Sequence, residues 1–130
     1  MPPAADPPPP PPPPDGVLVQ SVYTSPEGVP AGWRVWEDGR HEGMRAGGDW
    51  TAAPRLSSAA VAEVRATLEG ADLPAIAGAH HDPDSRPTDA VLWFQARLDE
   101  GPVAVGLVGS ARLPELTRLT EQLVPLLVGS

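Results

Sequence analysis

Alternating apolar and polar residues mark the first part of the chain as β structure. Residues 17–24 are rich in β-branched side chains and run into a Ser-Pro-Glu-Gly turn at 25–28, which predicts the first strand. Residues 32–37 and 40–45 then flank an Asp-Gly dipeptide at 38–39. Because this dipeptide tolerates the positive φ of a tight turn, the two segments are predicted to form a β-hairpin.

The pattern changes to a helical period after a short connection. Segment 46–54 holds two adjacent glycines and a proline, so it is predicted to be a connection in which Trp50 is embedded. Ser57 can cap the helix that follows, and Gly70 can end it. One face of this helix carries a stripe of apolar residues at helical spacing, namely Val61, Val64 and Leu68.

The second half of the chain repeats the order of hairpin and helix. Segment 71–89 lacks periodicity and is predicted to be a long loop, whereas 90–98 and 103–108 read as a second antiparallel hairpin. The last helix has Pro114 in its first turn, where a missing N–H costs nothing, and Pro125 is expected to kink or end it. Its apolar face consists of Leu113, Leu116, Leu119 and Leu123.

This order of elements predicts the α+β fold class. Strand, hairpin, helix, hairpin and helix give a four- to five-stranded antiparallel sheet with both helices packed on one face. Residues 16–130 are expected to form this single domain, and residues 1–15 a proline-rich arm. The second face of the sheet is left to water.

The arm has a composition that excludes helix and central strand. Pro7–Pro14 is an unbroken run of eight prolines, which favours a polyproline II rod roughly 25 Å long. Such a rod is either a pre-extended ligand for an aromatic-lined groove or a solvated leader without a partner.

Aromatic residues are expected on the uncovered face. Since side chains alternate across a strand, Trp33 and Trp36, three residues apart, point to opposite faces, and so do the adjacent Trp93 and Phe94. The outward members predict an apolar contact surface for a protein partner or for a second copy in a homodimer. The alternative is that the loop around Trp50, or the arm itself, covers them.

Charge and composition narrow the classes of partner. The chain has a net charge of −8, its nine basic residues are all arginine, and it has no cysteine. Disulfides and thiol chemistry are excluded, and nucleic acid and anionic membranes are unfavourable partners. The first residues resemble no targeting signal and no apolar run reaches membrane-spanning length, so we expect a cytoplasmic protein, and the residue usage is typical of a GC-rich bacterial genome.

Candidate catalytic and metal-binding chemistry is sparse. His80, His81 and Asp82 are adjacent residues able to ligate a metal, but the same residues are ordinary in a polar solvated loop. The sequence has no Gly-rich phosphate loop, HExxH helix or GxSxG elbow. We therefore expect no enzyme activity and no cofactor, with a small enzyme or metal-binding domain at His80 and His81 as an alternative.

The folded part resembles the emfourin family. The resemblance covers about residues 17–127 and rests on the early hairpin, on RLSSAAVAEVRATLEGADL at 55–73, and on Pro-Thr-Asp at 87–89 before a strand with Trp93 and Phe94. The family consists of small cytoplasmic proteins typified by an inhibitor of thermolysin-type metallopeptidases. The resemblance implies such an inhibitor, which would fill a substrate cleft with a loop at 25–32 or 75–89.

The first functional hypothesis is a non-catalytic protein–protein interaction module. Its contact would be the aromatic sheet face, the long loop or the arm, with Trp33, Trp36, Trp50, Trp93, Phe94, Pro7 and Pro14 as candidate binding residues. Inhibition of a peptidase is the alternative function, and the partner is not identified by the sequence.

Overall fold

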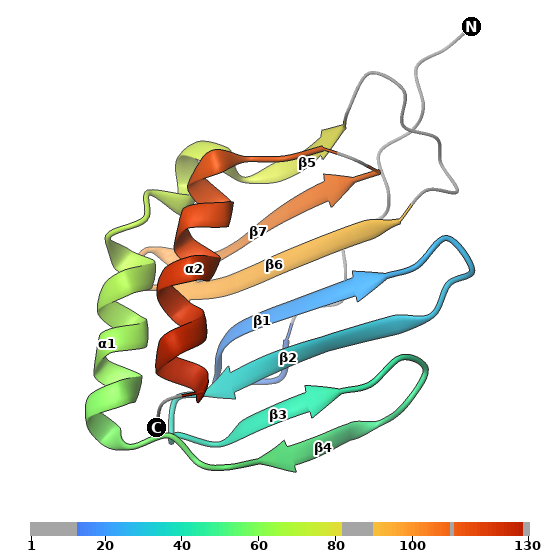
Figure 1. The fold of residues 1–130 in the computed structure, drawn as a ribbon. Coiled ribbons are helices and arrows are strands. Elements are labelled where there is room, and N and C mark those ends of the chain that lie inside the picture. Colours follow the sequence, from blue (N-terminus) through green and yellow to red (C-terminus); the bar gives the residue numbers. More distant parts are fainter. Residues whose placement is uncertain (1–12, 82–89, 110, 129–130) are drawn as a thin grey trace, which may run out of the picture.

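The computed structural model describes residues 13–81, 90–109 and 111–128, which form a sheet with two helices on one of its faces (Figure 1). The strands are β1 (Val17–Thr24), β2 (Pro30–Trp36), β3 (His41–Met44), β4 (Trp50–Ala53), β5 (Gly78–His81), β6 (Val91–Leu98) and β7 (Gly101–Val108). The helices are α1 (Ser58–Glu69) and α2 (Pro114–Val128), with a short 3₁₀ turn, η1 (Leu73–Ile76), after α1.

The described residues build a seven-stranded sheet in the order β4-β3-β2-β1-β6-β7-β5. Neighbouring strands are antiparallel from β4 to β7, while β5 pairs with β7 in parallel. The predicted α+β class and the two hairpins are therefore confirmed. The predicted count of four to five strands and the purely antiparallel sheet are wrong, because the sheet is larger and mixed.

Both additional strands lie in segments predicted as connections. β4 occupies the end of segment 46–54 and pairs with β3, and its hydrophobic pattern is masked by two alanines and by Pro54. β5 lies in segment 71–89 and has the sequence Gly-Ala-His-His, which lacks β-branched residues. Pairing with β7 along the opposite edge holds it in an extended conformation, so tertiary context overrides local propensity here.

The core lies between the sheet and the helices. Val35, Phe94 and Val105 are fully buried on the helix-facing side of three different strands. The predicted helical stripes pack against them, with Val61, Val64 and Leu68 from α1 and Leu116, Leu119 and Leu123 from α2. Full burial of such a side chain contributes about 1.5–3 kcal/mol, so this layer fixes which face of the sheet the helices cover.

The helix ends follow the sequence signals except in one place. The Ser57 hydroxyl accepts a hydrogen bond from the Ala60 amide at 3.1 Å, and Gly70 ends α1. Pro125 lies inside α2, which continues to Val128, so an end at Pro125 is not observed. Leu126 and Leu127 pack against the core and hold the last turn in place.

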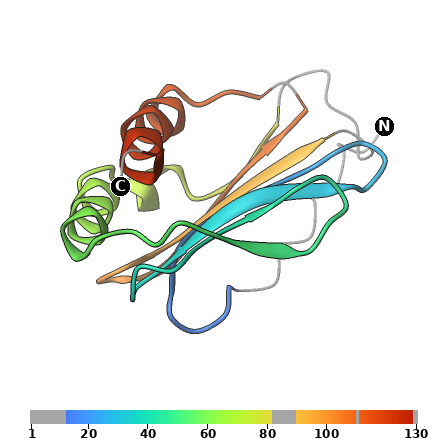
Figure 2. The same ribbon diagram turned by 60° about the horizontal axis from the view of Figure 1, so that its bottom comes forward.

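The opposite face of the sheet carries neither helix (Figure 2). We call it the open face. Trp33, Val35 and Phe94 point to the helices, so alternation and strand register place their neighbours on the open face. These neighbours include Gln20, Arg34, Trp36, Glu42, Trp50, Trp93 and Gln95.

Candidate functional site

Three of the four tryptophans lie on the open face. Trp36 comes from β2, Trp50 from β4 and Trp93 from β6. Trp33 and Phe94 lie on the other side of the sheet, where their rings meet edge to face with centroids 6.4 Å apart. Of the residues predicted for an aromatic surface, Trp36, Trp50 and Trp93 are thus on one face, whereas Trp33 and the buried Phe94 belong to the core layer.

Arginines stack on two of these tryptophans. The Arg34 guanidinium lies 5.2 Å from the centre of the Trp36 ring and 4.2 Å from that of Trp50. Arg40, beyond the β2–β3 turn, lies 4.1 Å from the centre of Trp36. Because a cation over an aromatic face is attracted by the ring quadrupole, these contacts form a connected cluster rather than bare rings. The predicted apolar surface therefore also contains the charged side chains of Arg34 and Arg40.

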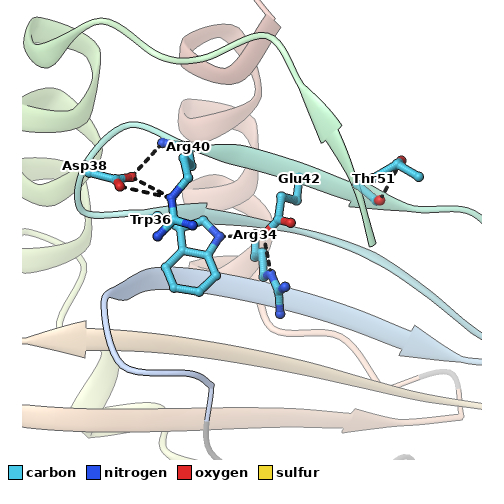
Figure 3. A network of polar contacts seen from close by, with 7 residues as sticks. Arg34, Trp36, Asp38, Arg40, Glu42 and Thr51 are labelled. Carbon is cyan, nitrogen blue, oxygen red and sulfur yellow. Dashed lines mark hydrogen bonds and ion pairs between the residues drawn. The ribbon is translucent and has the colours of Figure 1, made fainter. Parts of the chain in front are cut away.

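Glu42 on β3 joins this cluster at its centre (Figure 3). Its Oε1 accepts a hydrogen bond from Arg34 Nε at 2.8 Å and another from the Trp36 indole Nε1. The hydrogen bond from Arg34, followed by that from Trp36, lowers the pKa of Glu42 below its ordinary value of 4.5. The carboxylate therefore stays ionised and holds the side chains of β2 in fixed positions.

Asp38 orients the second arginine in the same way. Its carboxylate accepts hydrogen bonds from the Arg40 backbone amide and from Arg40 Nε, the latter at 2.9 Å (Figure 3). The hydrogen bond from the Arg40 backbone is the main cause that lowers the pKa of Asp38. Each arginine of the cluster is thus paired with one carboxylate, so the cluster adds little net charge to the open face.

Trp93 lies over a glycine of the neighbouring strand. Gly106 on β7 is directly opposite Trp93, and a Cβ built on Gly106 would be 2.9 Å from two atoms of the indole ring. The absence of a side chain at 106 therefore lets the ring lie close to the sheet backbone. Trp93 is half-buried as a result.

A buried polar pair lies between the aromatic residues. Gln20 on β1 and Gln95 on β6 are 9% and 6% exposed, and Gln20 Nε2 donates a hydrogen bond to Gln95 Oε1 at 3.3 Å. The Gln20 Oε1 atom is buried and has no hydrogen-bond partner among the described residues. Buried amides on a face without helices distinguish this part of the open face from an ordinary solvated surface.

The predicted metal-ligating residues are placed apart. His80 and His81 are consecutive on β5 and not on a loop, so their side chains point to opposite faces of the sheet. His80 Nε2 is 2.7 Å from the Ile76 carbonyl oxygen. Asp82 lies outside the described residues. In the part of the chain that the structure describes, no group of three histidines or carboxylates could hold a metal ion.

Of the two arm residues predicted to bind a partner, Pro14 lies within the described residues. Pro14 is exposed, and its carbonyl accepts a hydrogen bond from the Val17 amide at 3.1 Å. Pro7 lies outside the described residues. The part of the arm next to the sheet is therefore fixed to the start of β1.

Sequence reasoning missed the polar members of the cluster, Arg34, Arg40 and Glu42. A signal was present, since Arg34 and Glu42 flank the predicted turn and become cross-strand neighbours in the hairpin. Trp50 belongs to the cluster because segment 46–54 contains the strand β4, which the sequence analysis did not predict.

Comparison of the chain with protein-family models, with curated proteins and with solved structures finds no match. Among the described residues no helix is sufficiently long and apolar to cross a membrane.

Proposed function

We propose that this chain is a non-catalytic protein-binding module whose contact surface is the open face around Trp36, Trp50 and Trp93. The proposal is carried by one observation: three half-buried tryptophans lie on the sheet face that neither helix covers, and Arg34 links two of them, Trp36 and Trp50. Tryptophan and arginine are the residue types that dominate binding energy at protein interfaces.

The fixed positions of these side chains favour this role. Arg34 stacks on Trp36 and Trp50 and donates to Glu42, so three strands hold the cluster in one arrangement. Ordering a rotamer-rich side chain on binding costs about 0.5–1.5 kcal/mol. A surface that is already ordered avoids much of this cost, which supports recognition of a partner rather than simple solvation.

The experiment is partner capture with matched variants of the full chain. Trp50→Ala removes one ring of the face from the edge strand β4. Val124→Ala removes an exposed apolar side chain, 45% accessible, from α2 on the other side of the molecule. We expect a partner retained by the wild type and by Val124→Ala to be lost by Trp50→Ala, with circular dichroism showing that both variants are folded.

Two outcomes of this experiment reject the proposal. Retention of every partner by both Trp50→Ala and Trp93→Ala shows that the rings are not the contact. Equal loss by Val124→Ala shows that capture depends on general hydrophobicity. Sedimentation of the wild type alone identifies the case in which the partner is a second copy of the chain.

Inhibition of a peptidase is a second candidate, supported by the loop between β1 and β2. Ser25 holds this loop through its hydroxyl, which accepts from the Val29 amide at 3.2 Å, and through its backbone amide, which donates to the Val29 carbonyl at 3.0 Å. Residues 26–29 are exposed. A protruding loop fixed by its own hydrogen bonds can enter a cleft with little loss of conformational entropy.

Titration of a thermolysin-type metallopeptidase with the full chain tests this second candidate. We expect inhibition close to one molecule per enzyme, and we expect Val29→Asp to abolish it while Trp50→Ala does not. Full peptidase activity in a large excess of the chain rejects inhibition of this enzyme class.

A further inference from the structure

A hollow on the open face lies beside the root of the proline-rich arm. Its volume is about 290 Å³, and it is formed by the beginning of β1, the end of β6 and the beginning of β7. Its walls are mainly apolar, with one amide and one guanidinium, and consist of Pro13, Val17, Leu18, Gln95, Ala96, Arg97, Pro102, Val103 and Ala104. One arm proline, Pro13, is therefore already part of the wall.

A tight turn links the root of the arm to β1. The Val17 amide donates to the Pro14 carbonyl at 3.1 Å, and Gly16, the third residue of this turn, has a φ of 94°. This is the pattern of a type II turn, which reverses the chain and requires glycine at that position. Figure 2 shows the segment before β1 curving on the side of the sheet away from the helices.

Two further contacts fix the turn in this orientation. The Glu37 amide donates to the Gly16 carbonyl at 2.7 Å, which joins the turn to the end of β2. The Arg97 guanidinium at the hollow lies 3.7 Å from the carboxylate of Asp15. The root of the arm is thus attached on both sides, and Pro13 lies in the wall of the hollow.

We propose that the polyproline segment Pro7–Pro12 of the same chain occupies this hollow. From the turn, the segment has to pass over β6 and β7, about 10 Å at the usual strand spacing. A polyproline II rod rises about 3.1 Å per residue, so three or four prolines cover that distance and the others extend to the sheet edge.

The chemistry of the hollow fits a proline rod. Proline carbonyls accept hydrogen bonds and proline nitrogens donate none. Arg97 carries five N–H donors, so it can pair with Asp15 and also donate to a carbonyl of the rod. Val17, Pro102 and Ala104 provide the apolar contact for the proline rings. A rod of fixed φ loses little entropy when it docks, as in other polyproline complexes.

Disulfide trapping in the full chain tests this contact, because the natural sequence contains no cysteine. One variant carries Pro9→Cys with Pro102→Cys at the hollow. The control carries Pro9→Cys with Ala52→Cys, an exposed position on the same face but on β4 at the far side of the sheet. In mild glutathione buffer we expect the first variant to close its intramolecular disulfide at least ten-fold faster than the control.

Every other result overturns the inference. Equal rates mean that the arm has no preferred position on the sheet, and a faster control means that it prefers the side of β4. Disulfides formed mainly between molecules mean that the arm reaches a second copy instead. Replacing the remaining prolines at 7–12 by serine in the first variant should reduce its rate to that of the control, and an unchanged rate shows that the proline rod is not what docks.

Ala104→Cys replaces Pro102→Cys if the latter does not fold, since Ala104 lines the same hollow. The experiment contains no binding partner. Its outcome is therefore independent of the function proposed for the tryptophans.

Discussion

Arg34 on β2 stacks on Trp50 of β4 across the intervening strand β3, with 4.2 Å between the guanidinium carbon and the centre of the ring. β4 is an edge strand of four residues whose pairing partner is β3. A side-chain contact that reaches two strands away therefore helps to hold the edge of the sheet. Glu42 on β3 accepts a hydrogen bond from Arg34 Nε, so side-chain contacts connect the three strands on one face.

This relationship predicts a measurable coupling between Arg34 and Trp50. Arg34→Ala removes the cation from Trp50 and leaves Glu42 without its ion pair, and we expect the free energy of unfolding to fall by about 1–2 kcal/mol. A double-mutant cycle with Trp50→Ala should give a coupling energy of about 0.5–1 kcal/mol, measured by urea unfolding.

Two variants control this experiment. Arg45→Ala removes an exposed arginine just after β3 and should change the stability by less than about 0.5 kcal/mol. Arg34→Lys keeps the charge but not the planar guanidinium, so it should recover only part of the loss. A coupling energy near zero in the cycle contradicts the stacking interaction.

Acid should destabilise the fold through His41. Burial lowers the pKa of His41 below its ordinary value of 6.5, although a hydrogen bond to the Pro54 backbone opposes this. The unfolded chain then binds a proton at a higher pH than the folded chain, so the stability falls as the pH decreases below 6.5. Urea unfolding at pH 7.5 and pH 5.5 should show this loss, and His41→Leu should reduce it. An equal loss in the variant would show that His41 is not the cause.

Signals within short stretches of the sequence were sufficient to predict the two helices and the two hairpins. The Ser57 cap and the stripe of Val61, Val64 and Leu68 depend on spacing within one helix, and the structure contains both. β4 and β5 could not be recognised in the same way. Their extended conformation is imposed by pairing with β3 and β7, and their own residues show no strand pattern.

The sequence predicted only part of the cluster of Trp36, Trp50, Arg34, Arg40 and Glu42. Alternation predicts that Trp33 and Trp36 point to opposite faces, but the partners of Trp36 depend on the hairpin register. The Trp36 amide donates to the Arg40 carbonyl at 2.8 Å, and the Trp36 carbonyl accepts from the Gly39 amide at 3.0 Å, so residues 37–39 form a three-residue turn with Gly39 at a φ of 96°. A two-residue turn at Asp38-Gly39 would shift the register by one residue and move Glu42 to the other face.

The capping contact of α1 predicts a specific loss of stability. The Ser57 hydroxyl accepts from the Ala60 amide at 3.1 Å, and removal of such a cap costs about 1 kcal/mol. Ser57→Ala should therefore lower the free energy of unfolding by this amount. Ser58→Ala, one residue further along the helix, should have little effect because alanine is the better helix former there. Equal effects of the two substitutions would show that the cap does not contribute.

Gly106 and Gly43 form a matched pair of sheet glycines that tests the position of Trp93. A Cβ at 106 would lie 2.9 Å from two indole carbons of Trp93, whereas the nearest of the contacts at 43 is a backbone oxygen at 4.0 Å. Gly106→Ala must push the Trp93 ring off the sheet, which should cost about 1–3 kcal/mol and change the near-UV circular dichroism of tryptophan. Gly43→Ala should leave the spectrum unchanged and should not destabilise the fold, because a strand glycine gains from a side chain that has space. Equal stability of the two variants would place the Trp93 ring away from Gly106.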